Sequence, residues 1–87
     1  MPEVAETLAE REVSHGSYAH TANMAQSLKY MLARTQSKRS DVQNESLDMI
    51  CTKLARICSG DNNCMDHWLD IAGYASLVVK NLEDKNA

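Results

Sequence analysis

The sequence lacks phenylalanine, and aromatic residues make up only 5% of its 87 positions, although 44% of the residues are hydrophobic. Leucine, isoleucine, methionine, valine and alanine must therefore form the core, which favours helices over sheets. Runs of alternating polar and apolar residues long enough for a strand are absent as well. We therefore expect an all-α fold in a single domain over residues 1–87, with a core that is small for its surface.

Long apolar runs and paired cysteines are also missing. No segment approaches the roughly 18–20 apolar residues of a membrane-spanning helix, and the first residues are acidic rather than basic. The three cysteines are an odd number without a Cys-x-x-Cys pair, which is typical of free thiols in a reducing compartment. We therefore predict a cytoplasmic protein without membrane contact. Cys58, Cys64 and His67 could bind zinc, but they lack a fourth ligand.

An excess of positive charge is lacking, since the net charge is −3. This excludes a general electrostatic attraction to nucleic acid or to an anionic membrane. A local basic group at Lys29, Arg34, Lys38 and Arg39 has two interpretations: cations that complement a helix C-terminus, or a phosphate-binding patch. No Ser-His-Asp order, glycine-rich phosphate loop or HExxH motif is present, which argues against the common hydrolase and kinase templates.

Apolar periodicity predicts a short N-terminal helix at residues 3–13 and a longer helix at 18–34. The first has a thin apolar stripe, so residues 1–16 are expected to dock loosely. Gly16 permits a left-handed turn between the two helices, and Ser17 is placed to cap the second. The apolar positions expected on the buried face of the second helix are Tyr18, Ala22, Ala25, Leu28 and Leu32.

The third helix has a clear predicted start and end. Ser40 and Gln43 form a capping box, and Gly60 stands where helices commonly end. A short Asp-Asn-Asn turn then leads to a fourth helix that runs to Leu82, with residues 83–87 as a flexible tail. The short turn predicts that consecutive helices pack as antiparallel hairpins. The residues expected on the core face of the fourth helix are Trp68, Ile71, Ala72, Ala75, Val78, Val79 and Leu82.

A polar stripe on the fourth helix is the strongest candidate for a site. Asp66, Asp70, Gly73 and Tyr74 share one side of the helix, opposite its apolar stripe. Two carboxylates four residues apart repel unless a cation lies between them, and a mid-helix glycine costs about 1 kcal/mol. Lys53 and Arg56 on the preceding helix could neutralise the two carboxylates. The set therefore predicts either interhelical salt bridges or a ligand site.

Two other chemistries remain open. Glu45, Asp48, Asp66 and Asp70 could converge from two helices on Mg²⁺, which prefers a few carboxylates together with water and phosphates. His15 could act as an acid, base or ligand near neutral pH, although a loop histidine is more often only exposed. His20 has the same two interpretations, and Trp68 is predicted to belong to the core.

Three segments of the chain, within about residues 9–82, resemble an uncharacterised family of small helical proteins from bacteriophages and prophages. The segments are Arg11-Glu-x-x-His15-Gly16-Ser-Tyr18, then Asp41-Val-Gln-x-Glu45-x-Leu47-Asp48-Met49-Ile50-x-x-Lys53-x-x-Arg56-Ile57-x-x-Gly60-Asp61, and Asp66-His67-Trp68-x-Asp70-Ile71-Ala72-Gly73-Tyr74-Ala75. That family is distantly similar to all-α nucleoside triphosphate pyrophosphohydrolases of the MazG kind, which hold Mg²⁺ with Glu-Glu-x-x-Glu and Glu-x-x-Asp. Glu45-x-x-Asp48 resembles half of the first motif, and Asp66 and Asp70 have one residue more between them than the second.

The leading hypothesis is a non-catalytic, phage-type binding protein that recognises a nucleotide-like ligand or a host factor and could counteract host defence. In this hypothesis no cofactor is needed. Lys53 and Arg56 contact phosphate, while Asp66, Asp70 and Tyr74 hold them in place or contact a base or ribose.

Two alternatives come from other classes of protein. One is a Mg²⁺-dependent nucleotide pyrophosphohydrolase that uses the four carboxylates. The other is a structural helical oligomer. A homo-oligomer is expected in any case, because a small core with five methionines leaves apolar stripes that association would bury.

Overall fold

The computed structural model of the chain describes residues 4, 7, 10, 16–35 and 37–86. These residues contain three helices and no strand, which confirms the all-α fold class. The helices are α2 (Tyr18–Ala33), α3 (Asp41–Ser59) and α4 (Met65–Asn86). The helix predicted at residues 3–13 and the candidate residue His15 lie largely or wholly outside the described residues. No helix in the described part of the chain is long and apolar enough to cross a membrane.

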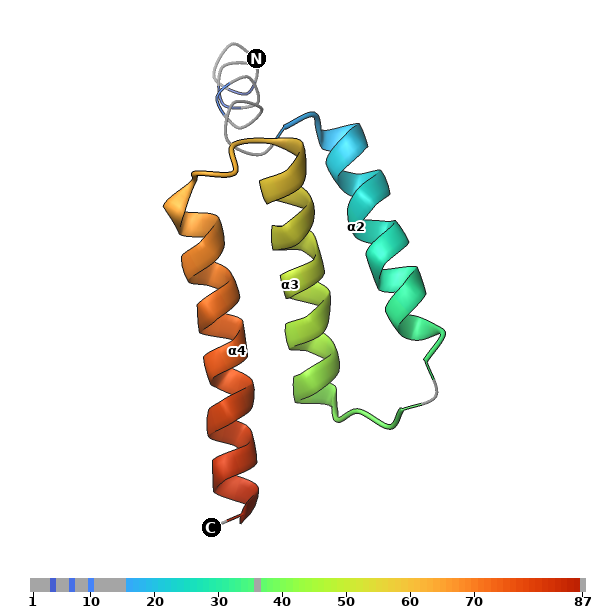
Figure 1. Cartoon of the computed structure of the whole chain (residues 1–87), viewed down its shortest axis with the longest axis vertical. Helices are drawn as coiled ribbons and strands as arrows, with labels where there is room; N and C mark the ends of the chain where they lie inside the picture. Colours follow the sequence, from blue (N-terminus) through green and yellow to red (C-terminus); the bar gives the residue numbers. More distant parts are fainter. Residues whose placement is uncertain (1–3, 5–6, 8–9, 11–15, 36, 87) are drawn as a thin grey trace.

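The three helices lie side by side in one layer, with α3 between α2 and α4 (Figure 1). Consecutive helices run in opposite directions (Figure 1). Helix α3 contacts both of its neighbours, whereas the described residues of α2 and α4 make no contact with each other. The helices therefore form an open layer and not a closed bundle.

The start of α3 is fixed by the predicted capping box. The Ser40 hydroxyl accepts a hydrogen bond from the Gln43 N–H at 3.1 Å, and the Gln43 side chain accepts one from the Ser40 N–H at 2.9 Å. Arg39 orders the preceding loop by donating to the Leu32 carbonyl at 2.9 Å and to the Asn44 side chain at 2.9 Å. These bonds fix the point at which the chain turns from α2 into α3.

Two helix ends differ from the prediction. Ser17 precedes α2, but its side chain makes no capping hydrogen bond. Helix α4 continues through Asn86, so the predicted flexible tail from residue 83 is wrong for residues 83–86. Glu83, Asp84 and Lys85 are compatible with a helix, and Lys85 lies in the last turn, where a cation complements the helix dipole.

The buried residues of the layer are mostly small. Ala55 is completely buried, and Ala25, Cys51 and Ile57 are the other buried apolar side chains among the described residues. The predicted core faces of α2 and α4 are wrong in part, since Tyr18 is 83% exposed and Trp68 is 52% exposed. Helix α4 has one neighbour only, so a single helix covers only part of its broad apolar stripe. The further residues of that stripe that remain exposed are Ala72, Ala75, Val79 and Leu82.

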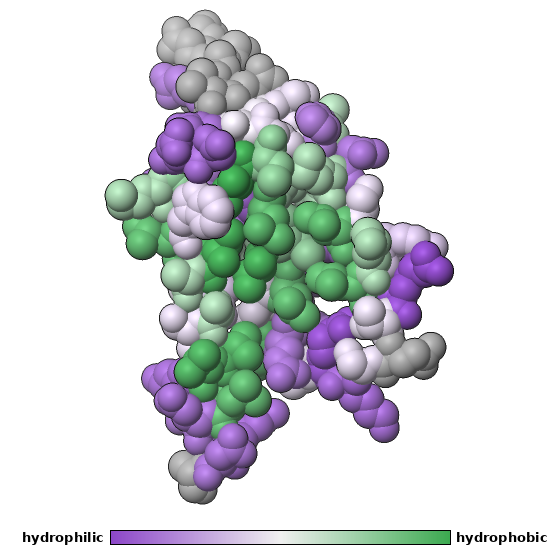
Figure 2. Space-filling view, in the orientation of Figure 1, coloured by the Kyte–Doolittle hydropathy of each residue, from purple (hydrophilic) through white to green (hydrophobic). Residues whose placement is uncertain are grey.

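The exposed and half-buried apolar side chains gather on one side of the layer, which we call the apolar face. Figure 2 shows this face, on which hydrophobic residues spread over all three helices. A repeat of 3.6 residues per turn places the members of each helix on one side. The apolar face consists of Met24, Leu28 and Met31 of α2, Leu47, Ile50, Leu54 and Cys58 of α3, and Trp68, Ala75, Val78, Val79 and Leu82 of α4.

The opposite side of the layer, which we call the polar face, carries the candidate site. The helical repeat places several charged residues of α3 and α4 on this side, about half a turn around each helix from the apolar face. Its members are Glu45, Asp48, Thr52 and Arg56 of α3 and Asp66, Asp70, Gly73 and Leu77 of α4. The layer therefore separates a polar surface from an apolar one.

Candidate ligand-binding site

An ion pair joins α3 to α4 at the edge of the polar face. The Lys53 ammonium lies 2.9 Å from an Asp70 carboxylate oxygen. The Lys53 side chain is only 12% exposed, whereas that of Asp70 is 46% exposed. The hydrogen bond from Lys53 lowers the pKa of Asp70, and the positive charges of Lys53, His67 and Arg56 act in the same direction. The pair holds the lysine in one position and leaves the carboxylate open to solvent.

Arg56 adds a second cation to this cluster. It follows Lys53 by one helical turn, is half-buried, and lies close enough for its charge to lower the pKa of Asp70. Within the described part of the chain, no carboxylate forms an ion pair with Arg56. The guanidinium of Arg56 therefore has no ion-paired carboxylate among the described residues, and its donors can bind an anion.

The other predicted site residues on α4 lie one turn to either side of Asp70. Asp66 is exposed in the first turn, where a carboxylate complements the helix N-terminus, and Tyr74 is half-buried. A Cβ added at Gly73 would meet no atom within 4 Å. No other backbone of the described chain therefore approaches this glycine closely. The open space beside Asp70 is available to a ligand.

The four carboxylates of the magnesium hypothesis lie at different levels of the layer. The Lys53–Asp70 pair sets the register of the two antiparallel helices, which places Asp66 beside the end of α3 near Ile57. Glu45 lies near the start of α3, about 18 Å away along the helix axis. Among the described residues, no three His, Cys, Asp or Glu side chains are grouped as a metal site would require. The structure therefore does not bring these four residues together.

The same search over the described residues finds no zinc site at Cys58, Cys64 and His67. Cys58 is exposed and Cys64 is partly exposed. His67, by contrast, is 2% exposed and lies close enough to Asp70 to contribute to the lowering of the Asp70 pKa. The sequence predicts His67 only as a possible zinc ligand. Its position three residues before Asp70, about one helical turn, is the feature that places it beside the ion pair.

Trp68 and Cys51 have structural roles and do not belong to the candidate site. The Trp68 indole donates a hydrogen bond to the Asn62 carbonyl at 2.9 Å and so ties α4 to the preceding turn. Burial raises the pKa of the Cys51 thiol, and the neighbouring Asp48 carboxylate adds to this effect. Cys51 is therefore a poor nucleophile, and it belongs to the core and not to the site. His20 is exposed.

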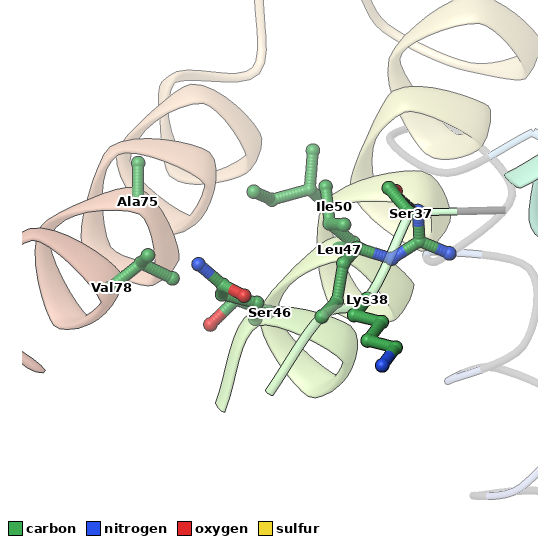
Figure 3. A pocket seen from close by; sticks show the side chains of 9 residues that line it. Ser37, Lys38, Ser46, Leu47, Ile50, Ala75 and Val78 are labelled. Atoms are coloured by element: carbon green, nitrogen blue, oxygen red, sulfur yellow. Dashed lines mark hydrogen bonds between the residues drawn. The ribbon is translucent and has the colours of Figure 1, made fainter. Parts of the chain in front are cut away.

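A hollow of about 430 Å³ lies on the other side of the layer, on the apolar face. Figure 3 shows Leu47 and Ile50 of α3 facing Ala75 and Val78 of α4 across it. Lys38 lies at its margin, beside Arg39, whose side chain is already bonded to Leu32, Thr35, Ser37 and Asn44. The hollow is thus an apolar recess that lies away from the cation cluster.

The Lys53–Asp70 pair predicts a specific dependence of stability on pH. Because the pKa of Asp70 is lower in the folded chain than the value of about 3.9 in an unfolded one, the pair stabilises the fold above about pH 4 and is lost as the pH falls through the folded pKa. We expect Asp70→Asn to melt below the wild type at neutral pH, and the two melting temperatures to converge in acid. Asp84→Asn, at an exposed carboxylate of the same helix, is the control. A difference for Asp70→Asn that is equal at pH 7 and in acid would contradict the assignment.

Comparison with known proteins identifies one sequence family. A family profile described as a domain of unknown function (DUF6378) matches residues 2–81, which is most of the chain. No curated protein and no solved structure matches the chain significantly.

Proposed function

The chain belongs to the DUF6378 family, and we propose that it is a non-catalytic binding protein for a phosphate-bearing, nucleotide-like ligand. The single observation that carries the proposal is Arg56, which lies beside the Lys53–Asp70 pair and forms no ion pair with a carboxylate among the described residues. Arg56 and Lys53 would contact the phosphate, and Asp70 would position Lys53.

The chemistry of the two cations suits a phosphate group. A guanidinium presents a planar set of donors that binds phosphate oxygens in pairs, and a lysine ammonium adds a point charge. The 2.9 Å contact with Asp70 already restricts the motion of Lys53, so binding costs less side-chain entropy. The Lys53 side chain is also mostly buried, and partial burial strengthens the interaction of a cation with an anion.

The surface next to the cations suits the nucleoside part of such a ligand. The space beside Gly73 is open, so a flat group can approach the α4 backbone there. Asp66 and Asp70 offer carboxylate oxygens to ribose hydroxyls or to base N–H groups, and Tyr74 offers an aromatic ring. These groups lie within two turns of one helix, so one small molecule can contact all of them.

Binding is favoured over hydrolysis by the spacing of the carboxylates. A magnesium-dependent pyrophosphohydrolase needs several carboxylates on one metal cluster, and Glu45 and Asp66 are separated by most of the α3–α4 contact. The resemblance to small phage proteins extends the proposal to a phage-encoded role against a nucleotide signal of host defence. A host protein as the target is the outcome that a negative ligand test would favour.

A thermal-shift screen with nucleoside triphosphates, cyclic nucleotides and ADP-ribose, each with and without Mg²⁺, tests the proposal. We expect at least one of these compounds to raise the melting temperature and to be recovered intact. Arg56→Gln should raise the Kd at least about tenfold, because it removes a charge-assisted hydrogen bond, while the helical circular dichroism is unchanged. Lys80→Gln, which removes an exposed cation of α4 outside the proposed site, is the control.

Two outcomes of this screen would contradict the proposal. Magnesium-dependent conversion of a triphosphate would establish the enzyme in place of the binder. Absence of any shift would overturn the nucleotide ligand, and a protein target would then be sought by pull-down.

A further inference from the structure

The apolar face leaves large hydrophobic side chains open to solvent. Met31 is 65% exposed, Val79 is 54% exposed and Leu54 is 37% exposed. No large side chain in the described part of the chain is fully buried.

Helix α4 carries the pattern of a helix that packs against a second partner. An exposed apolar residue recurs along it at alternating spacings of three and four, the pattern of the contact seam between paired helices. The seam residues are Met65, Trp68, Ala72, Ala75, Val79 and Leu82. Helix α3 lies on a neighbouring side of α4, and α2 makes no contact with α4 in the described chain. No helix among α2, α3 and α4 therefore covers the seam.

We propose that a second copy of this chain covers the apolar face, so that two three-helix layers pack face to face in a two-fold symmetric dimer. A two-fold interface pairs the same patch on both subunits, and this patch is apolar on all three helices (Figure 2). The recess between Ile50 and Val78 receives a side chain from the opposite layer.

Opposite charges at the two edges of the layer support a second copy of the chain as the partner. The basic residues Arg34, Lys38 and Arg39 lie at one edge of the layer, where α2 turns into α3, and the acidic residues Glu83 and Asp84 lie at the other edge, at the end of α4. Both groups are at the same end of the layer (Figure 1). A two-fold axis parallel to the helices therefore places the acidic end of each α4 over the basic loop of the partner.

The dimer leaves the polar face of each layer on the outside. The partner then covers neither Arg56 nor Asp70 in either copy, so the assembly presents two copies of the proposed ligand site. The dimer does not depend on the identity of that ligand. A failure of either proposal leaves the other intact.

Sedimentation of the full-length chain tests the dimer directly. We expect a mass twice that of the single chain at micromolar concentration for the wild type. Val79→Glu should shift the mass to that of one chain, because a buried charge in the interface lacks a partner. Leu77→Glu is the matched control, since Leu77 is 58% exposed on the polar face of the same helix, close to the 54% of Val79. A wild type at single-chain mass, or a dimer lost in Leu77→Glu and kept in Val79→Glu, would overturn the proposal.

A second measurement uses only the wild type, in case Val79→Glu does not fold. Cys58 lies on the apolar face one turn after Leu54, and Cys64 lies in the turn before α4. In the dimer the partner covers Cys58, so diluting the protein should accelerate alkylation of Cys58 relative to Cys64. A ratio of the two rates that does not change with protein concentration would contradict the interface.

Discussion

Replacing Gly16 with alanine is expected to lower the free energy of unfolding by roughly 2–5 kcal/mol. Gly16 has a φ of 77°, in the left-handed region that a residue with a Cβ rarely adopts. A Cβ at this position would also overlap the backbone carbonyl of Ser59, at the end of α3. Backbone atoms cannot move aside as a flexible side chain can, so the start of α2 would have to shift away from α3.

Gly73→Ala is the matched control for this substitution. A Cβ at Gly73 meets nothing within 4 Å, and the residue lies within α4, where alanine is favoured over glycine by about 0.5–1 kcal/mol. Chemical unfolding of both variants at one protein concentration should therefore give shifts of opposite sign. Equal stabilities for Gly16→Ala and the wild type would show that α2 does not pack against Ser59 as described.

Ala55→Leu is expected to lower the free energy of unfolding by about 1–3 kcal/mol, because overpacking a tight contact forces the helices apart. Ala55 is 0% exposed. It lies one turn before Ser59 on α3 and so faces α2, where Ala25 is also buried. Two small residues at this contact allow α2 and α3 to approach closely, and the three additional carbon atoms of leucine have no space there.

Urea unfolding measures this effect, with Ala33→Leu as the control. Ala33 is exposed near the end of α2, so the same change in side chain should alter the stability by less than about 0.5 kcal/mol. A wild-type stability for Ala55→Leu would mean that α2 and α3 are not in close contact at this level.

The helices could be predicted because their signals are local. Ser40 and Gln43 are three residues apart and satisfy each other across one turn, so the start of α3 depends on no distant contact. The end of α4 differs from the predicted end at Leu82 because the charged residues after Leu82 resemble a polar tail, although they continue the helix to Asn86. Glu83 and Lys85 are compatible with a helix as well as with a loop, and composition does not distinguish the two.

The burial of the apolar residues could not be predicted in the same way. Periodicity shows which side of a helix is apolar, but it does not show how many neighbours cover that side. Trp68 and Val79 share a stripe with the half-buried Ile71, yet they are 52% and 54% exposed. The sequence indicates a wide apolar stripe, and only the arrangement of the layer shows that one helix covers part of it.

The ion pair of the candidate site could be predicted from the sequence, but the arrangement of the other site residues could not. The opposite charges of Lys53 and Asp70 on helices joined by a short turn indicated that a pair could form, and the pair is present. The register between α3 and α4 depends on the geometry of the turn and on side-chain packing, which spacing along the chain does not contain. That register separates Glu45 from Asp66. The sequence alone therefore could not show whether the four carboxylates of the magnesium hypothesis lie close together.

The two proposals assign a different role to each surface of the layer. The apolar face would hold two copies together, and the polar face of each copy would bind the ligand. Arg56 is central to the second role, because it supplies the cation that no described carboxylate neutralises in an ion pair.

The most direct test of ligand binding compares the melting temperatures of the wild type and Arg56→Gln in the presence of tripolyphosphate and of a nucleoside triphosphate. We predict that both compounds raise the melting temperature of the wild type, the nucleotide more strongly because of its contacts beside Gly73, and that neither raises that of Arg56→Gln. Equal shifts in the wild type and in Arg56→Gln would contradict a phosphate site on the polar face.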